Sequence, residues 1–151
     1  MQLTRFTDLG LRITMLLAAA PADRQLSTAQ VAEQMRVPYA HAAKVVARLT
    51  GLGVVESTRG RAGGIRLAES GAGRSVGWIA RRLEGDGEIV ECEGADPCPL
   101  RQACRLRGAL RQAQEAFFQV LDRQTVADMV RVPTEPILRE LVLSAGREKG
   151  N

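Results

Sequence analysis

Residues 54–68 read VVESTRGRAGGIRLA, two short runs with β-branched residues joined by a segment rich in glycine and arginine. This pattern predicts a β-hairpin with its tip at residues 60–64. Three segments with helical periodicity precede the hairpin, at about residues 4–20, 28–35 and 38–53. Because three helices followed by a hairpin form a winged helix-turn-helix, the sequence predicts that fold for the N-terminal half.

The first predicted helix has two faces that differ in character. Along one face apolar side chains recur every three or four residues, which predicts a stripe buried in a core. A second, semi-apolar face carries Asp8, Leu11 and Met15 and predicts contact with another element. Arg5, Asp8 and Arg12 interrupt the apolar run, so the segment is not predicted to be a signal peptide or a membrane span. We therefore expect a cytoplasmic protein that does not meet a membrane.

The C-terminal half is predicted to contain a loop and a long helix. A fourth helix at residues 75–85 is followed by a loop at residues 85–99, rich in glycine, acid and proline. At about residues 100–121, apolar side chains alternate at spacings of three and four, which is typical of a helix that packs along another helix. A short helix at residues 125–130 and a tail broken by prolines follow. The predicted fold class is mainly α with a small β-hairpin.

Composition bounds the class of function. The chain has 151 residues, a net charge of +4 and a pI near 9.5, which favours a basic domain that meets a polyanion. The segment RGRAGG does not match a dinucleotide-binding motif, because it lies in a hairpin and no helix begins on it. The single histidine, His41, and the lack of paired carboxylates placed for acid–base work argue against catalysis. We therefore expect no enzyme.

The third helix and the hairpin are predicted to form a DNA-binding surface. The helix turns alanines and Lys44 outward, and small side chains allow a close approach to the floor of the major groove. Arginines around the glycine tip suit a phosphate track or a narrow minor groove. The alternative is an ordinary solvated hairpin with flexible glycines. The candidate contact residues for double-stranded DNA are Thr28, Tyr39, Ala40, His41, Ala43, Lys44, Arg48, Arg59, Arg61, Gly63 and Arg66.

All three cysteines lie in CEGADPCPLRQAC, residues 92–104, with five residues between neighbours. An odd number of clustered cysteines predicts a metal site or reactive thiols rather than disulfides. Thiolates suit zinc, copper(I) or an iron–sulfur cluster, but zinc sites favour shorter spacings and a fourth cysteine or histidine. The five-residue gaps therefore favour a cubane iron–sulfur cluster, 4Fe-4S, whose ligands are further apart than those of one tetrahedral ion. A zinc site, a thiol switch and buried structural cysteines are the alternatives.

A 4Fe-4S cluster held by three cysteines needs a fourth ligand, which can be a carboxylate from elsewhere, a water or a small thiol. Glu91, Glu93 and Asp96 stand so close to the cysteines in sequence that reaching the remaining iron would strain the loop. Asp8 is the stronger candidate, because the first helix carries it on the semi-apolar face. The alternative for Asp8 is a surface ion pair with Arg12 at i, i+4, worth only a few tenths of a kcal/mol.

Three stretches together resemble one protein family. They are MQLTRFTDLGLR at residues 1–12, GLGVVESTRGRAGGIRLA at residues 51–68, and the cysteine loop with CRLRGAL at residues 104–110. Over residues 1–135 the chain is similar to the NsrR-type nitric oxide-sensing iron–sulfur repressors, a winged-helix family that also includes IscR. The cysteine spacing is the most specific element of the resemblance.

The resemblance implies a site and an assembly. Cys92, Cys98 and Cys104 would bind the cluster, and the protein would be a homodimer with the long helix at its interface. In the NsrR type an aspartate on the first helix of the other subunit completes a 4Fe-4S site, and Asp8 stands at the matching place. IscR-type proteins use a histidine three residues after the third cysteine, where this chain has Arg107. This departure argues against an IscR-like 2Fe-2S site.

The resemblance also implies a function and a domain organisation. The protein would be a repressor that binds a two-fold DNA operator and releases it when nitric oxide reacts with the cluster, relieving repression of nitric oxide-detoxification genes. The alternative is a winged-helix regulator that senses iron–sulfur status, redox state or zinc through the same cysteines. The expected parts are a winged helix-turn-helix DNA-binding domain at residues 1–84, a cluster-binding loop and long dimerisation helix at residues 85–122, and a short helix with a C-terminal tail at residues 123–151.

Overall fold

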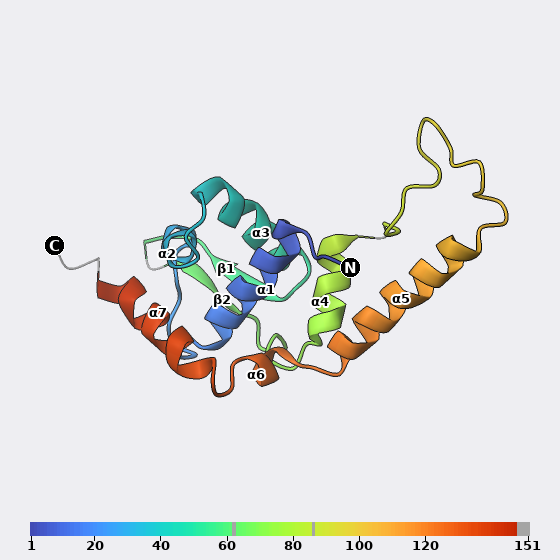
Figure 1. Ribbon diagram of the computed structural model, residues 1–151. Helices are drawn as coiled ribbons and strands as arrows, with labels where there is room; N and C mark the ends of the chain where they lie inside the picture. The colour runs from blue at the N-terminus through green and yellow to red at the C-terminus, as the bar shows by residue number, and fades with distance from the viewer. Residues whose placement is uncertain (62, 86, 148–151) are drawn as a thin grey trace.

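The computed structural model describes residues 1–61, 63–85 and 87–147 (Figure 1). It confirms the predicted order of three helices, a hairpin and further helices, which is the winged helix-turn-helix order. Ala62 in the predicted hairpin tip, Asp86 in the predicted loop and the end of the predicted tail lie outside the described residues. The elements are α1 (Arg5–Ala18), α2 (Thr28–Gln34), α3 (Tyr39–Gly51), β1 (Val55–Thr58), β2 (Gly64–Leu67), α4 (Val76–Glu84), α5 (Arg105–Asp122), α6 (Val126–Met129) and α7 (Glu135–Arg147).

Local signals set where the helices begin in residues 1–84, the predicted DNA-binding domain and here called the DNA-binding half. Ser27 caps α2 in a capping box: its Oγ accepts from the backbone N–H of Gln30 at 3.1 Å, and the Gln30 side chain accepts from the Ser27 N–H at 2.8 Å. Thr4 and Ser75 cap α1 and α4, each by accepting one backbone N–H. Pro38 precedes α3, and its fixed φ prepares the chain for the helix without a side-chain cap.

The hydrophobic core forms around α1, which runs through the middle of the DNA-binding half (Figure 1). Ile13 and Leu16 on α1 are fully buried, and the helix packs against α3, α4 and β2. The buried stripe predicted on the first helix is thus confirmed. The buried core residues are Leu9, Ile13, Leu16, Leu17, Leu26, Val31, Val45, Val46, Leu49, Val54, Val55, Ile65, Ile79, Val126, Leu138, Val142 and Ala145.

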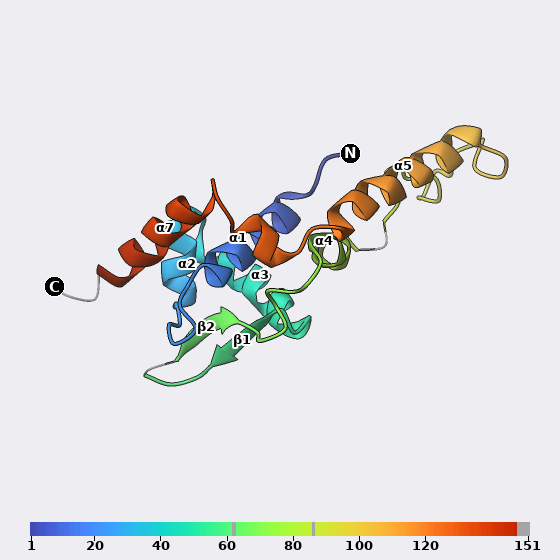
Figure 2. The ribbon, with the colours of Figure 1, turned by 90° about the horizontal axis from the view of Figure 1, so that it is seen from below.

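The hairpin pairs β1 and β2 antiparallel, with Thr58 opposite Gly64. Near the turn, β2 is fixed to the segment before α2, since Leu26 and Ile65 exchange two backbone hydrogen bonds of 3.0 and 2.7 Å. Gly64 must be glycine, because a Cβ would lie 2.9 Å from the carbonyl oxygen of Leu26. The hairpin is therefore held to the body close to its turn, and it lies at one edge of the fold (Figure 2).

The C-terminal segment differs from the predicted broken tail. α7 is a helix of 13 residues that packs on α1 and α2, and it adds Leu138, Val142 and Ala145 to the core. Pro136 does not break this helix, because it lies in the first turn, where a missing N–H leaves no hydrogen bond unmade. The expectation of a broken tail is wrong for this reason.

The long helix begins later than predicted. α5 starts at Arg105, so that residues 92–104 form a loop ahead of it. The helix buries one side chain, Phe118, while Leu106 and Val120 on the predicted apolar seam are 65% and 61% exposed. The loop and the first part of α5 stand away from the DNA-binding half in both views (Figures 1 and 2). In the described ranges no helix combines the length and the apolar content of a membrane span.

Candidate metal centre and nucleic-acid interface

The three predicted cysteine ligands lie together in one loop. Cys92 is buried, and Cys98 and Cys104 are half-buried free thiols like it. The backbone N–H of Cys98 donates to the carbonyl oxygen of Cys92 at 3.1 Å, which turns the first part of the loop back on itself. Cys104 ends the loop as the N-cap of α5, where its Sγ accepts a hydrogen bond from the backbone N–H of Arg107 at 3.4 Å.

The thiols influence one another electrostatically. Burial raises the pKa of the Cys92 thiol, the positive charge of Arg107 lowers it, and the charges of Cys98 and Cys104 raise it. The three thiols are therefore within electrostatic reach of each other. In the part of the chain that the structure describes, however, no three His, Cys, Asp or Glu side chains are placed to hold a metal ion. The loop gathers three soft donors without converging on the tetrahedral geometry of a single-ion site.

Arg107 connects the cysteine loop to α5. Its Nε lies 2.6 Å from a carboxylate oxygen of Glu88, and its Nη1 lies 2.8 Å from one of Glu93. These pairs raise the pKa of Arg107 and hold the pKa of Glu88 below its usual range. This network is not predicted in the sequence analysis, although Glu88 and Glu93, which stand on either side of Cys92, are a signal for a basic partner. Arg107 thus keeps a positive charge fixed beside the first cysteine.

Within one chain Asp8 is not brought to the cysteines. It lies half-buried near the start of α1, and its Oδ1 accepts a hydrogen bond from Nε of Arg12 at 2.9 Å. This is the ion pair of the alternative interpretation. The cysteine loop lies beyond the far end of α5 in both views (Figures 1 and 2). An Asp8 that contacts the loop would therefore have to come from a second chain.

The surroundings of Asp8 are electropositive. Asp8 borders a cavity of about 700 Å³ between α1 and the segment that joins α2 to α3. Apolar side chains such as Leu9, Met35 and Val37 line part of it. The cationic residues that line it are Arg5, Arg12, Arg36 and Lys44. This cavity suits a segment that carries negative charge.

The predicted outward face of α3 is open to solvent. Tyr39 is 61% exposed, Ala40, His41 and Lys44 are exposed, and Ala43 is half-buried. The opposite face of α3 enters the core. Small side chains beside Lys44 let the helix approach a groove floor closely, as the sequence predicts.

Two of the predicted DNA contacts, Arg48 and Arg66, pair with other groups of the chain. Arg48 donates from Nη2 to the carbonyl oxygen of Arg82 on α4 at 2.9 Å. Arg66 pairs with Glu56 directly across the hairpin, with 2.8 Å between Nη2 and Oε2. Thr28 is the half-buried first residue of α2. Arg48 and Arg66 are thus each held by a partner within the chain.

The end of the hairpin presents the other two predicted arginines. Arg59 and Arg61 are exposed beside the turn. Gly63 is required next to them, because a Cβ would lie only 2.2 Å from the carbonyl oxygen of Thr58. The turn is therefore slender and basic, as a minor groove or a phosphate track requires.

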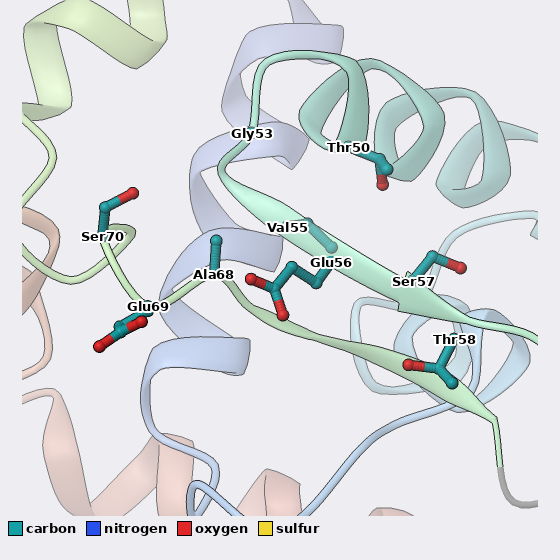
Figure 3. Close-up of a pocket in the computed structure, with 9 residues that line it drawn as sticks. All are labelled: Thr50, Gly53, Val55, Glu56, Ser57, Thr58, Ala68, Glu69 and Ser70. Atoms are coloured by element: carbon teal, nitrogen blue, oxygen red, sulfur yellow. The ribbon is translucent and has the colours of Figure 1, made fainter.

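Sequence reasoning missed a set of hydroxyl groups beside the hairpin. Figure 3 shows Thr50, at the end of α3, above the strand that carries Ser57 and Thr58. These residues line a shallow hollow of about 740 Å³ along β1. Hydroxyl groups of this kind often bind phosphate oxygens in DNA complexes. The helical spacing of Ala43, Ala47 and Thr50 is the signal that places Thr50 on the outward face.

Known proteins resemble this chain over nearly its whole length. It is 58% identical over 139 residues to the HTH-type transcriptional repressor NsrR of Streptomyces coelicolor, and the match covers 91% of this chain and 94% of that relative. It is 42% identical over 132 residues to the HTH-type transcriptional regulator NsrR of Shouchella clausii, with 86% and 89% covered. The solved structure of T. potens IscR has a TM-score of 0.67 at 24% identity, and 86% of each chain is covered.

These similarities confirm the predicted resemblance and the predicted fold. The relatives are transcriptional regulators, which confirms that the chain is not an enzyme. A family model described as Rrf2, iron-dependent transcriptional regulator, matches residues 3–132, and the chain belongs to this family of DNA-binding transcriptional regulators.

Proposed function

We propose that this protein is a homodimeric repressor whose binding to a two-fold DNA site is controlled by an iron–sulfur cluster. Nitric oxide reacts with that cluster and relieves repression of nitric oxide-detoxification genes. The observation that carries the proposal is that three free thiols share one loop, whereas α1, the helix that carries Asp8, lies apart from that loop in the same chain (Figure 1). The repressor name of the 58% identical relative supports the regulatory class.

The donor set suits a 4Fe-4S cluster better than a single ion. Cys92, Cys98 and Cys104 would each hold one iron as soft thiolates, and the partner's Asp8 would supply a harder oxygen donor to the fourth. When bound, the cluster supplies an iron that a small ligand such as nitric oxide can reach. Burial raises the pKa of Cys92, and the charge of Arg107 opposes that shift and so favours the thiolate form that ligation needs.

A second copy of the chain would account for two exposed features. Leu106 and Val120 lie on an apolar seam of α5 and are mostly exposed in a single chain. Asp8 borders a cavity with a basic rim, whereas the loop that holds the cysteines is rich in acids, Glu91 and Glu93 among them. Opposite charges would guide the loop of one chain onto α1 of its partner. A dimer formed through α5 would therefore also complete the ligand set.

In this proposal α3 and the hairpin make the DNA contacts. Tyr39, His41 and Lys44 lie exposed on α3 and would approach the bases of the major groove. Arg59 and Arg61 would contact phosphates or the minor groove. In a dimer, two α3 helices about 34 Å apart would read successive major grooves of a two-fold site.

A site shared between the cysteine loop and the partner's Asp8 would also explain how the cluster controls DNA binding. While the cluster is bound, the thiolates of one chain and the partner's Asp8 would all be its ligands, so the cysteine loop would be held to α1 of the partner. When the cluster is lost, the cysteine loop of one chain and α1 of its partner can separate, and the spacing of the two α3 helices changes. Because a two-fold site requires a fixed half-site spacing, DNA binding falls.

Anaerobic purification with iron and sulfide analysis tests the proposal. We expect a brown protein with about four irons and four sulfides per chain. Nitric oxide should bleach its absorbance in step with the release of a DNA fragment that the loaded protein selects from random sequence. A colourless protein that holds stoichiometric zinc and still binds DNA would contradict the proposal and indicate a zinc regulator.

A pair of aspartate variants separates a cluster sensor from a thiol switch. Asp8→Ala should make the cluster decay faster in air and change its absorption spectrum, because the oxygen ligand is lost. Asp23→Ala removes an exposed aspartate before α2 and should leave both unchanged. Equal behaviour of the two variants would favour a thiol switch.

A further inference from the structure

One arginine clamps α4 to α5. Arg81 places Nη1 2.8 Å from Oε2 of Glu115 and Nη2 2.9 Å from Oδ2 of Asp122. Its guanidinium also lies 4.6 Å from the ring centre of Phe118. The hydrogen bonds from Arg81 lower the pKa of both carboxyl groups. A single side chain of α4 thus holds three residues on one face of α5.

The backbones of α4 and α5 meet directly at Gly77. A Cβ on this residue would lie 2.6 Å from the backbone nitrogen of Asp122 and 2.7 Å from the carbonyl oxygen of Phe118. Ser75, the N-cap of α4, donates from its Oγ to Oδ1 of Asp122 at 2.9 Å. With backbone contact at one end and the Arg81 clamp further along, α4 must follow a shift of α5.

α4 is connected in turn to α3. Nη2 of Arg48 donates to the carbonyl oxygen of Arg82 at 2.9 Å. This carbonyl belongs to the last turn of α4, where helical carbonyls lack partners within the helix. Arg81, which contacts α5, and Arg82, whose carbonyl contacts α3, are consecutive residues of α4. A continuous set of contacts therefore runs from α5 through α4 to Arg48, one turn beyond Lys44 on the outward face.

The other end of α5 begins at the third cysteine. Cys104 is the N-cap, and the helix that follows has 18 residues, a length of about 27 Å. A helix of this length moves nearly as a rigid rod. A displacement of Cys104 therefore also displaces Glu115 and Asp122, the two residues that pair with Arg81.

We propose that Arg81 and Arg48 are positioning residues that couple the cysteine end of α5 to the recognition helix α3. The inference rests on the proposed function, because it requires the state of the cysteine site to change DNA binding. Arg81 passes a shift of α5 to α4, and Arg48 passes it to α3. Arg48 thereby has a role in addition to the DNA contact expected from the sequence, since its Nη2 donates to the carbonyl of Arg82.

The test compares DNA affinity with and without the cluster. For each chain, fluorescence anisotropy gives the Kd of the anaerobically loaded and the cluster-free protein for one DNA fragment, and the ratio of the two measures the coupling. Arg81→Met should keep its iron and sulfide content but reduce this ratio by about fivefold or more. Arg48→Met should reduce it similarly, and the double variant no further, because both residues act in one path. Arg81→Lys, which can retain one ion pair, should fall between.

Arg82→Met is the matched control. Its guanidinium lies over the ring of Trp78 at 5.1 Å, and the substitution leaves the backbone carbonyl that accepts from Arg48. This variant should keep the ratio of the unsubstituted chain. If Arg48 contacts DNA and nothing more, Arg48→Met will weaken both states equally and preserve the ratio, which overturns the inference.

Hydrogen exchange tests the coupling independently of the proposed function. If the loaded and the cluster-free unsubstituted chain bind DNA with equal Kd, the proposed function is contradicted. Exchange of the α3 amides around Arg48 would still decide the coupling in cluster-free protein. Arg81→Met should speed that exchange, whereas Arg82→Met should not. Equal exchange in the unsubstituted chain and in both variants would overturn the coupling.

Discussion

The DNA-binding half and the α5 arm, residues 87–122, differ in how they bury their side chains. Ile13 is fully buried in the DNA-binding half, and α7 adds Leu138 to the same core from the far end of the chain. The α5 arm buries Cys92 and Phe118 alone among its residues. The first region is stabilised by its own contacts, whereas the second presents surfaces suited to a further partner. Stability therefore depends mainly on the DNA-binding half, whereas the α5 arm is the part to which the proposed function assigns regulation.

The largest change in the free energy of unfolding should come from a buried leucine of α7, with an exposed leucine on the same helix as its control. Leu138 on α7 is 6% exposed and Leu143 is 58% exposed. Leu138→Ala should lower the free energy of unfolding by about 2 to 5 kcal/mol, because it opens a cavity in the core. Leu143→Ala should change it by less than about 0.5 kcal/mol. Urea unfolding measures both, and similar losses would show that α7 does not belong to the core of the DNA-binding half.

Alanine substitutions at two glycines, one where α4 contacts α5 and one on the open surface of α5, should change the free energy of unfolding in opposite directions. Gly77→Ala should cost about 1 to 3 kcal/mol, because the new Cβ overlaps the backbone of α5. Gly108 lies inside α5 with open space around it, so Gly108→Ala should stabilise the chain by up to about 1 kcal/mol through helix propensity. Thermal unfolding distinguishes them. A stabilising Gly77→Ala would contradict the close contact of α4 with α5.

The apolar seam of the α5 arm should matter for assembly. Leu106→Ala should weaken the proposed dimer about tenfold, or roughly 1.4 kcal/mol, because the side chain would be buried between two copies. Gln112→Ala, an exposed position off the seam, should leave the dimer unchanged. Sedimentation equilibrium measures both dissociation constants. Equal constants for Leu106→Ala and the unsubstituted chain would place the dimer interface elsewhere.

The smallest effect should appear as a pH dependence of the Arg81 clamp. Arg81 lowers the pKa values of Glu115 and Asp122, and a carboxyl whose pKa is lowered by folding contributes stability above its unfolded pKa, about 4. That stability is lost as the pH falls through the lowered folded values. The urea midpoints of the unsubstituted chain and Arg81→Met should differ by a small, constant amount from pH 8 to about pH 5 and converge in more acid. A difference that varies between pH 5 and pH 8 would exclude these carboxylates as the cause.

The predictable part of the fold is the part set by local signals. Caps and apolar spacing placed α1 to α4 within two residues at each end. α7 escaped prediction because Pro133 and Pro136 resemble helix breakers, and Pro136 is harmless only as a first-turn residue. Its packing on α1 and α2 joins the two ends of the chain, and no local pattern encodes such a contact.

The candidate site divides in the same way. Cysteine spacing predicted one loop with three thiols, and the structure gathers them there. The semi-apolar face of the first helix singles out Asp8, but only the family resemblance points to a second chain, because periodicity in one sequence does not say which chain a face contacts. Arg48 and Arg66 were expected at DNA from their positions on one helix and one strand. Their partners, Arg82 and Glu56, come from neighbouring elements whose placement requires the folded chain.

The most direct test of the central claim, that the site is completed across two chains, is a mixed dimer. One chain carries Asp8→Ala and the other Cys92→Ser, with different tags so that the heterodimer can be purified anaerobically. The loop of the first chain and Asp8 of the second are both intact in this heterodimer. The account predicts that its cluster shows the spectrum and air stability of the unsubstituted protein. A cluster that decays as fast as in the Asp8→Ala homodimer would contradict it.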